Sequence, residues 1–345
     1  MRARSRKGTA RVGQLPEPRR ILLVRTDRIG ELLLTTPAFS AVRESFTGAK
    51  IDLMVRPSSS PVVEGNPSLD SIIKIDPDSD LNSFAKRLKF IRRLAASGFD
   101  MAIIFNPNKF LNIAVFLAGI PVRVGYDRKL GFLLTHAIED KKHLCEKHEV
   151  EYDLDLARAA GACADGKGPC FPLSESDERN AEKILKENGI KEAGACFVAI
   201  HPSTSNPEKA WPAEKFAEVS DMVMEKFRAS IVIVGGGGER GIADRLKSKA
   251  RNKVIDLTGK LSLKELGAVL KKASLLISCD SGPVHVASAV ETPVVALFGE
   301  SRPGGSSKRW GPYGRRHVVV GKPKVTDITV GEVFEAASGI LCKRR

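Results

Sequence analysis

The fold is decided by a stretch near the start of the chain, ILLVRTDRIGELLLTTPAFSAVRESF, which covers residues 21–46. Its first four residues are apolar and have the length of a buried strand. A polar turn follows from Arg25 to Gly30, and an apolar helix candidate then runs to about Phe46. A strand that passes through a short turn into a helix is the building unit of a parallel α/β sheet.

The same alternation of strand and helix continues along the chain. Further strands are predicted at residues 51–55, 71–75, 102–105, 197–200, 231–234, 275–277 and, as the final strand, 293–298. Helices are predicted at about 81–97, 110–118 and 177–187, from Pro212, and after capping boxes formed by Ser262 with Glu265 and by Thr329 with Glu332. The helix after Thr329 should end near Ile340. Gly98 should stop the helix predicted at about 81–97.

A lapse in this pattern between Gly161 and Pro172 predicts a boundary between two α/β domains. The expected organisation is a basic disordered tail over residues 1–20, an N-terminal domain over 21–165, a C-terminal domain over 173–326 and a C-terminal helix with a basic end over 327–345. Two such domains in tandem would place a ligand in the cleft between them, outside the carboxyl ends of the strands.

Composition and charge exclude several classes of protein. The 345 residues include 42% hydrophobic and 28% charged residues, too apolar for a disordered chain, and no stretch approaches the ~18 residues of a membrane span. The net charge is +14, and much of it lies in residues 1–20 and in the last three residues, which form cationic arms. Such arms attract anionic lipid, whereas the absence of aromatic residues among them disfavours nucleic acid as a partner.

The cysteines and the arms also bear on the compartment. Six cysteines are present without any C-x-x-C spacing, which is typical of reduced thiols in a cytosolic protein rather than of a disulfide framework or a zinc site. The basic N-terminal arm has no apolar core and is therefore not a secretory signal.

One strand-to-helix junction, from His201 to Pro212, suits a phosphate. Ser203 and Thr204 supply hydroxyl donors, Lys209 supplies charge, and a helix start supplies amides. From the residues alone, a plain polar loop with Ser or Thr caps is equally consistent with this segment.

A second junction contains the run Gly235–Gly238, followed by Glu239 and Gly241. Together with Asp256 it formally satisfies the dinucleotide-binding fingerprint, although a run of four glycines meets that pattern easily. A tight turn with close backbone approach is the safer prediction. Glu239 can accept hydrogen bonds from a ribose or simply favour the helix dipole.

A third junction reads Asp280-Ser281-Gly282 and again exposes helix amides to an anion, unless Asp280 serves only as a helix cap. His285 lies among apolar residues of the following helix, where a packed histidine is more usual than a catalyst. In the first half, Asp27 and Glu31 follow the first strand and can supply a general base, or can simply be acidic residues in a first helical turn. No H-E-x-x-H, Walker A or G-x-S-x-G segment is present, and no cluster suggests a metal site.

Taken together, four segments resemble the ordered signatures of glycosyltransferase family 9, the bacterial lipopolysaccharide heptosyltransferases. They are the opening stretch at residues 21–46, HPSTSNPEKAWPAEKFAEV from His201, DLTGKLSLKELGAVLKKASLLISCDSGPVHVASAVETPVVALFG from Asp256, and RWGPYG from Arg309. The resemblance implies a GT-B fold, in which two Rossmann-like domains face each other across a cleft. It also implies an acceptor site in the N-terminal half and a nucleotide-sugar site in the C-terminal half.

The resemblance further implies roles for single residues. Glu31 occupies the position of the catalytic base, where aspartate is usual, with Asp27 as the nearby substitute, and Lys209 matches the lysine that holds the diphosphate. The residues expected to bind the nucleotide sugar are Ser203, Thr204, Gly235, Gly236, Glu239, Asp280, Ser281, Gly282 and His285. Trp310 belongs to the last signature without an assigned role.

The expected function is therefore that of an inverting, metal-independent transferase without a cofactor, which moves heptose from ADP-heptose to an acceptor sugar of the lipopolysaccharide core or lipid A. Its partners would be the nucleotide sugar and an anionic lipid-linked acceptor, and it would bind no nucleic acid. The protein would be cytoplasmic and would act at the inner face of the inner membrane. Three alternatives stay open: another nucleotide-sugar transferase of the cell envelope, an NAD-dependent oxidoreductase that uses the glycine fingerprint, and a catalytically silent ADP-sugar-binding protein.

Overall fold

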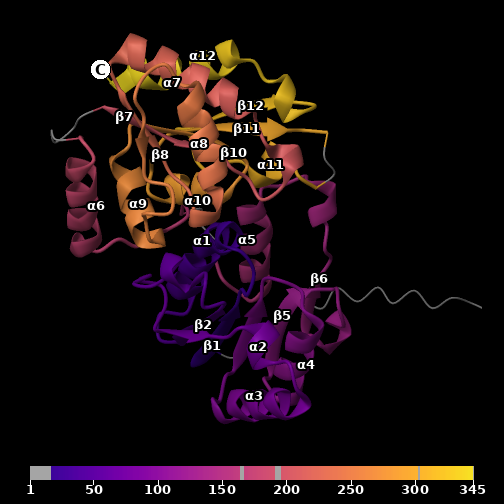
Figure 1. Ribbon diagram of the computed structural model, residues 1–345. Coiled ribbons are helices and arrows are strands. Elements are labelled where there is room, and N and C mark those ends of the chain that lie inside the picture. The colour runs from indigo at the N-terminus through magenta and orange to yellow at the C-terminus, as the bar shows by residue number, and fades with distance from the viewer. Residues whose placement is uncertain (1–16, 164–166, 191–195, 302–303, 345) are drawn as a thin grey trace, which may run out of the picture.

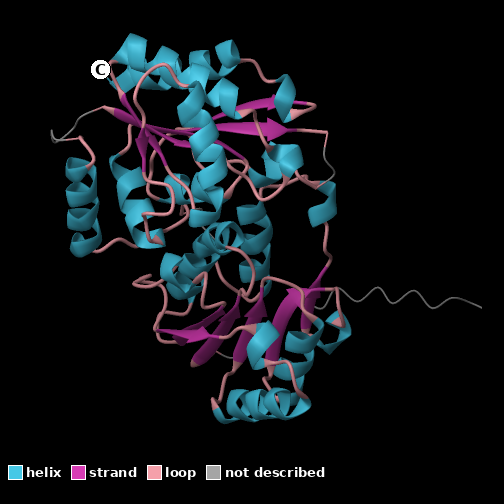
Figure 2. Cartoon of the chain, in the orientation of Figure 1, coloured by secondary structure: helices cyan, strands magenta, loops and turns pink. Residues whose placement is uncertain are grey.

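The computed structural model describes residues 17–163, 167–190, 196–301 and 304–344, and it consists of two α/β halves stacked one above the other (Figure 1). In each half a parallel sheet lies in the middle and helices cover it (Figure 2). Residues 1–16, and with them most of the predicted basic tail, lie outside the described residues, whereas Arg20 is the first residue of the first strand.

The N-terminal sheet is built from the first six strands in the order β3-β2-β1-β4-β5-β6, and every neighbouring pair is parallel. The strands are β1 (Arg20–Val24), β2 (Lys50–Val55), β3 (Ser71–Lys74), β4 (Met101–Ile104), β5 (Val122–Tyr126) and β6 (His136–Ile138). The chain order reverses between β1 and β4, so this sheet has its topological switch point there.

The C-terminal sheet has the order β12-β11-β10-β7-β8-β9 and is also parallel throughout. Its strands are β7 (Phe197–His201), β8 (Ser230–Ile233), β9 (Ile255–Asp256), β10 (Leu275–Cys279), β11 (Val294–Gly299) and β12 (Val318–Lys322). Counted from its own first strand, this sheet repeats the order of the N-terminal sheet, and its switch point lies between β7 and β10.

The helices follow the strands in the expected alternation. Those of the N-terminal half are α1 (Ile29–Ser45), α2 (Pro77–Asp80), α3 (Phe84–Ala96), α4 (Lys109–Leu117) and α5 (Glu149–Ala159). Those of the C-terminal half are α6 (Glu175–Glu187), α7 (Ala213–Phe227), α8 (Arg240–Lys249), α9 (Leu263–Lys272), α10 (Gly282–Ala289), α11 (Ser307–Trp310) and α12 (Val330–Leu341). None of the described helices is long and apolar enough to cross a bilayer.

The predicted helix ends are confirmed where they depend on local chemistry. Ser262 and Glu265 form a reciprocal capping box at α9, and Thr329 and Glu332 form another at α12. Gly98 adopts a φ of +63° directly after α3, the left-handed conformation that ends a helix at low steric cost.

Several elements were not predicted. The segment 293–298, expected to be the final strand, is followed by β12, an edge strand whose Val318 and Val319 are partly exposed. Helix α5 was missed because two of its acidic residues, Glu149 and Asp153, are buried and so blur the apolar face. The strands β5 and β6, which complete the N-terminal sheet, were missed as well.

The two halves share one apolar core. Leu32 and Leu33 from α1 and Val284 and Val286 from α10 belong to a single buried cluster, and α1 packs against both α5 and α10. The N-terminal ends of α1 and α10, each of which follows a switch-point strand, therefore lie close together.

Candidate active site

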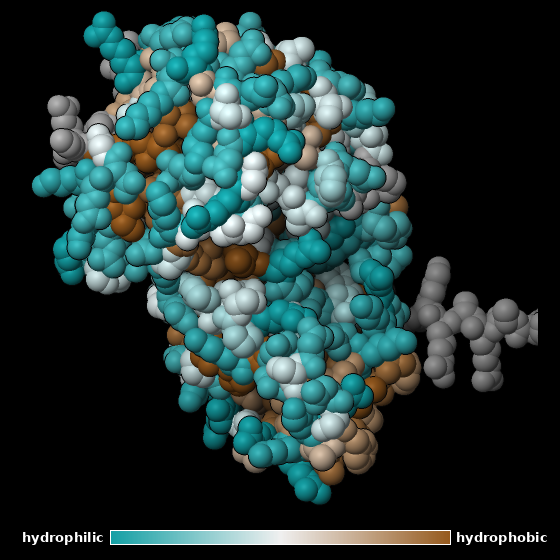
Figure 3. Space-filling view, viewed as in Figure 1, coloured by the Kyte–Doolittle hydropathy of each residue, from teal (hydrophilic) through white to brown (hydrophobic). Residues whose placement is uncertain are grey.

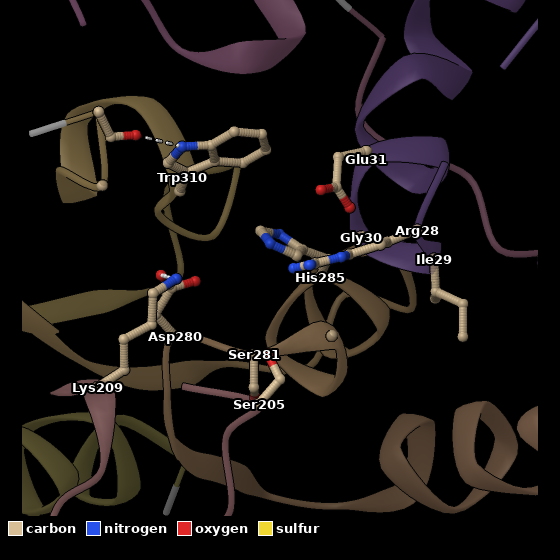
Figure 4. Close-up of a pocket in the computed structure, with 13 residues that line it drawn as sticks. Arg28, Ile29, Gly30, Glu31, Ser205, Lys209, Asp280, Ser281, His285 and Trp310 are labelled. Atoms are coloured by element: carbon tan, nitrogen blue, oxygen red, sulfur yellow. Dashed lines mark hydrogen bonds and ion pairs between the residues drawn. The ribbon is translucent and has the colours of Figure 1, made fainter. Parts of the chain in front are cut away.

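A cavity of about 370 Å³ lies between the N-terminal ends of α1 and α10 (Figure 4). Five of its lining side chains carry chemistry: Glu31, Lys209, Asp280, His285 and Trp310. They come from both halves of the molecule, so the carboxyl ends of both sheets contribute to one site.

The N-terminal half contributes Glu31, which lies in the first turn of α1. Figure 4 shows its carboxyl group extending from α1 into the cavity, above His285 and across from Trp310. The neighbouring Gly30 allows the close approach of the two helices, since a Cβ atom there would lie 2.7 Å from Cδ2 of His285. The first turn of a helix favours an acidic side chain, so the position suits Glu31.

The C-terminal half contributes Lys209 and Asp280, which form an ion pair inside the cavity. Lys209 ends a short 3-10 turn after β7, and Asp280 directly follows β10, so the pair joins the two strands of the switch point. The Asp280 side chain is only 11% exposed. An anion that entered the cavity would compete with the Asp280 carboxylate for the Lys209 ammonium group.

The N-terminus of α10 has few free amides, because Pro283 has no N–H group and the Val284 amide donates to the Ser281 carbonyl at 3.2 Å. Ser281 is its cap residue, yet no side chain of the described residues caps the helix, and its first turn contains no acidic residue. Both Ser281 and Gly282 line the cavity. The positive end of a helix without a side-chain cap is a usual binding site for a phosphate group.

His285 is buried and neutral. Burial lowers the pKa of His285 to about 3, and the nearby His148 and Lys209 act in the same direction. Its Nδ1 atom has no hydrogen-bond partner among the described residues, so the ring is not the fully satisfied packed histidine that its apolar neighbours in the sequence indicate. His285 instead lines the cavity with a ring whose buried Nδ1 atom is unpaired among the described residues.

A second cavity of about 440 Å³ adjoins the first, and the two share Ile29, Ser205, Ser281 and Gly282. Its polar side carries Thr204, Gly235, Gly236 and Glu239, and its apolar side carries Leu261, Leu263 and Leu266. An apolar wall opposite a carboxylate suits a nucleoside, whose base is flat and whose ribose offers hydroxyl donors.

The carboxylate of Glu239 is held firmly in this second cavity. One of its oxygens accepts hydrogen bonds from the Gly236 amide at 2.6 Å and from Nε2 of His201 at 3.2 Å. Although burial favours the neutral acid, these bonds and His201 lower the pKa of Glu239 to about 2. The group is therefore a permanent acceptor at neutral pH.

The hydroxyl residues after β7 have different positions. Thr204 lines the second cavity and donates to the Asp280 carbonyl at 3.4 Å, whereas Ser203 interacts with the Glu239 side chain and lines neither cavity. Ser205, which sequence reasoning did not single out, lines both.

Asp27 lies outside the cavity that holds Lys209 and Asp280. Its carboxylate lies 2.9 Å from Nε of Arg25 and lines a third cavity, of about 640 Å³, in the N-terminal half. Burial raises the pKa of Asp27 in spite of the neighbouring Arg25. Of the two candidate bases, only Glu31 is brought together with the pair from the C-terminal half.

That third cavity lies at the N-terminal switch point and is basic and polar. Arg28 and Ile29 line both it and the first cavity, so the two are adjacent. Its wall also carries Arg56 and Lys129, against the carboxylates of Asp27 and Asp78, and Arg56 pairs with Asp78 at 3.0 Å. Arg28 and Lys129 form no ion pair with a described residue, so the cavity keeps a small positive excess that suits an anionic molecule reaching toward Glu31.

Asp256, the acid of the glycine fingerprint, is engaged elsewhere. Its carboxylate accepts a hydrogen bond from Lys247 at 2.7 Å and one from the Thr258 amide at 2.9 Å. It lines neither of the cavities near the glycine run, so the arrangement lacks the ribose-binding acid that a dinucleotide site of this kind uses.

The RWGPYG segment ties the two halves together, a role that its sequence did not reveal. Arg309 donates to Glu149 of α5 at 2.9 Å and to the Lys142 carbonyl at 3.1 Å, and Nε2 of His148 lies 2.9 Å from the Gly311 carbonyl. Trp310 lies between these contacts and lines the first cavity, with its indole nitrogen donating to the Gly304 carbonyl at 2.9 Å (Figure 4).

Behind this segment lies a buried charge cluster of Arg25, Lys142, Glu149 and Asp153. Lys142 contacts Glu149 at 2.6 Å and Asp153 at 3.1 Å, and Arg25 lies 3.4 Å from each carboxylate. Burial opposes the charged form, yet the surrounding cations lower the pKa of Glu149 to about 2. Within the described residues, no group of three or more His, Cys, Asp or Glu side chains could hold a metal ion.

Similar folds exist among solved structures. A glycosyl transferase family 9 protein from Veillonella parvula superposes with a TM-score of 0.86 at 24% identity, over 94% of this chain and 98% of that one. The ADP-heptose lps heptosyltransferase II of E. coli gives a TM-score of 0.79 at 19% identity, over 94% and 99%. The fold and the paired switch points thus define the GT-B class, as expected from the sequence.

The sequence comparisons then give the family. The model of glycosyltransferase family 9 (heptosyltransferase) matches residues 87–332, and the chain belongs to this family. Lipopolysaccharide heptosyltransferase 3 of Escherichia coli K12 is 28% identical over 280 residues, which is 78% of this chain and 79% of that protein. Lipopolysaccharide heptosyltransferase 1 of the same strain is 24% identical, over 88% and 94%.

Proposed function

We propose that this protein transfers heptose from ADP-heptose to an anionic, lipid-linked sugar of the lipopolysaccharide core or lipid A, with inversion at the anomeric carbon. The observation that carries the proposal is the placement of Glu31 from one half opposite the Lys209–Asp280 pair and the α10 amides of the other half. Family membership and the printed names of the relatives agree with a heptosyl donor.

In this proposal the donor spans the two connected cavities. The adenine packs against Leu261, Leu263 and Leu266, and the ribose hydroxyls donate to Glu239. The diphosphate then reaches the α10 N-terminus at Ser281 and Gly282, and the sugar enters the cavity beside Glu31. The acceptor approaches from the basic third cavity.

The proposed reaction is a single displacement. Glu31 takes the proton of the acceptor hydroxyl as its oxygen attacks the anomeric carbon from the face opposite the nucleotide. The bond from that carbon to the diphosphate breaks, and its electron pair stays on the departing ADP. The α10 amides and Lys209 stabilise this growing charge, so the reaction uses neither a metal nor a cofactor.

The charge of the site also predicts how Lys209 behaves when donor binds. In the ligand-free arrangement its ammonium group is neutralised by Asp280. A bound diphosphate offers stronger acceptors, which frees the Asp280 carboxylate to accept from a sugar hydroxyl. The pair thus serves the leaving group and the sugar at once.

The first experiment measures thermal stabilisation by ADP, UDP, GDP and NAD at equal concentrations. A ligand at 100 times its Kd adds about 2.7 kcal/mol to the free energy of unfolding. We expect ADP to give the largest shift, and turnover of ADP-heptose with a lipid A-type acceptor then tests the transfer itself. A selective shift by NAD would replace the transferase with an oxidoreductase, and ADP binding without turnover would leave an ADP-sugar-binding protein.

The proposed place of action is the inner face of the inner membrane, reached from the cytoplasm. Its support is chemical: the proposed acceptor is anionic, and the cavity that would receive it carries Arg28 and Lys129, which form no ion pair with a described residue. High salt should release such a protein from isolated membranes, because salt screens the attraction.

A further inference from the structure

Large exposed apolar side chains gather at one end of the molecule. Of the eight in the described residues, five lie between positions 84 and 132: Phe84, Leu88, Phe116, Leu117 and Phe132. Figure 3 shows brown and tan side chains at the lower right, over the end of the N-terminal half where α3 and α4 lie in Figure 1. A cluster of this kind on a soluble domain marks an interaction surface.

Helix α3 supplies the charge of this surface. It carries five cations and no acidic residue: Lys86, Arg87, Lys89, Arg92 and Arg93. None of them forms an ion pair with any described residue. An unpaired cationic helix is exposed to the full attraction of an anionic partner.

The apolar residues of α3 divide into two sets. Phe90, Ile91 and Leu94 pack against the domain, whereas Phe84 is 81% exposed and Leu88 is 36% exposed. Positions four apart share one side of a helix, so Phe84 and Leu88 form an exposed apolar edge beside the cations. This arrangement is typical of a helix that lies in a membrane interface.

Two neighbouring segments extend this edge. Phe116 and Leu117 end α4, which packs against α3, and Phe132 lies 77% exposed on the 3-10 turn Gly131–Leu133, which packs against α4. The guanidinium of Arg123 lies 5.4 Å from the centre of the Phe116 ring. The apolar side chains of the surface thus have cations beside them on α3 and at Phe116.

We propose that this surface, formed by α3, the end of α4 and the turn Gly131–Leu133, docks the protein on an anionic lipid bilayer. The cations match the charge of the headgroups, and the five exposed apolar side chains enter the region between headgroups and acyl chains. A second copy of the chain is a poor occupant, because a symmetric contact would bring the α3 cations of two copies together.

The position of this docking surface fits the third cavity. Pro77 and Asp78 before α3, Asn108 at the start of α4 and Lys129 before the turn all line that cavity. A bilayer on the docking surface would thus lie beside the cavity that receives the acceptor in the proposed function. Only this last link rests on the proposed function, since the docking itself requires no sugar chemistry.

The test measures co-sedimentation of the full chain with vesicles of phosphatidylglycerol and phosphatidylcholine, compared with phosphatidylcholine alone. Wild type should bind only the anionic vesicles. The variant Lys89→Glu/Arg92→Glu/Arg93→Glu should bind at least roughly 100-fold more weakly, because each lost cation removes about a fivefold gain in affinity. The matched control reverses three exposed, unpaired cations of the other half, Arg245→Glu/Lys249→Glu/Lys253→Glu, and should bind like wild type.

Two further variants keep the proposal open to contradiction. Phe84→Trp adds a reporter to a chain with two tryptophans, and its emission should shift to the blue when vesicles are added. A chain that starts at residue 17 removes the N-terminal arm and should keep most of the binding. Loss of binding in the truncated chain but not in the α3 variant would overturn the proposal, and so would preference for a single-stranded oligonucleotide over the vesicles.

The ADP shift of each variant is recorded in parallel. An unchanged shift shows that the α3 variant is folded, so its loss of vesicle binding supports the docking surface. Wild type that responds to ADP without binding anionic vesicles overturns the docking and leaves the proposed function intact. Vesicle binding without any response to ADP has the opposite meaning: it supports the docking and contradicts the proposed function.

Discussion

The two switch points of this molecule have the same strand order but differ in the charge of the helix that follows each of them. At the N-terminal switch point, Arg25 pairs with Asp27 and the Arg56 guanidinium donates to the Thr26 carbonyl at 2.8 Å. At the C-terminal one, Lys209 pairs with Asp280, and the first turn of α10 beside this pair contains no acidic residue. One backbone plan therefore serves two charge-paired junctions, of which only the N-terminal one is followed by an acidic first helical turn.

The difference teaches how the site divides its work. Helix α1 places a carboxylate, Glu31, in its first turn, whereas α10 leaves its first turn free of acidic side chains. A helix N-terminus can stabilise one anion. At α1 that anion is the Glu31 carboxylate of the protein itself, and at α10 it can be an anionic group of a ligand. Helix α1 is therefore suited to supply a base, and α10 is suited to bind a leaving group.

The strongest test of this division is Glu31→Gln. The amide keeps the shape of the side chain and removes the base, so kcat should fall at least ~10²-fold while the ADP shift stays unchanged. The control is Asp27→Asn, at the acid that lies in the neighbouring cavity. If Asp27→Asn loses more turnover than Glu31→Gln, the role of the base passes from Glu31 to Asp27.

The variant Lys209→Met tests the contribution of the C-terminal half. Removing a group that stabilises the leaving diphosphate should lower kcat by about 10²-fold, as for other preorganised charge donors. Lys253→Met, an exposed lysine of the same half, should leave turnover as in wild type. A Lys209→Met enzyme with full activity would assign the whole stabilisation to the α10 amides.

The close approach of the two helices is tested by a matched pair of glycines, each the second residue of its helix. A Cβ at Gly30 would contact the His285 ring, so Gly30→Ala should lower the free energy of unfolding by ~1–3 kcal/mol. At Gly331 in α12 nothing lies within 4 Å of a new Cβ, and Gly331→Ala should raise stability by ~0.5–1 kcal/mol. Equal effects in chemical denaturation would contradict the tight contact.

The last expected effect is a pH dependence of stability that comes from His285. Its pKa is about 3 in the folded protein and ~6.5 in the unfolded chain, so between these values only the unfolded chain takes up the proton. Acidification therefore favours unfolding, by up to ~2 kcal/mol at pH 5. Denaturation of His285→Gln between pH 7 and pH 5 should show a smaller loss than wild type, and parallel slopes would refute the buried neutral ring.

Much of this arrangement is predictable from sequence because it is local. Each of these features depends on a few residues that are adjacent in the sequence: the strand-turn-helix units, the capping boxes and the residues after β1, β7 and β10. The GT-B architecture followed from their repetition and resemblance to the family. Glu31, Lys209 and Asp280 were all expected in the cleft, and they line one cavity.

The remaining features depend on contacts between distant residues. Arg309 and Glu149 are 160 positions apart, and nothing near either residue indicates the other. The separation of Asp27 from Glu31 into different cavities could not be predicted, because the third cavity is assembled from several loops. The apolar neighbours of His285 in the sequence indicate a packed, fully hydrogen-bonded ring, yet its Nδ1 atom is unpaired among the described residues. The surroundings of the ring come partly from α1, which its own sequence neighbours do not reveal.

The buried cluster shared by α1 and α10 has a consequence for how the molecule melts. Because Leu32 and Val284 belong to one core, and Arg309 joins α5, neither half can lose its structure without uncovering apolar surface on the other. Scanning calorimetry should then record one heat-absorption peak rather than two. A gene fragment that encodes only one half should yield a polypeptide that aggregates when its partner fragment is not co-expressed.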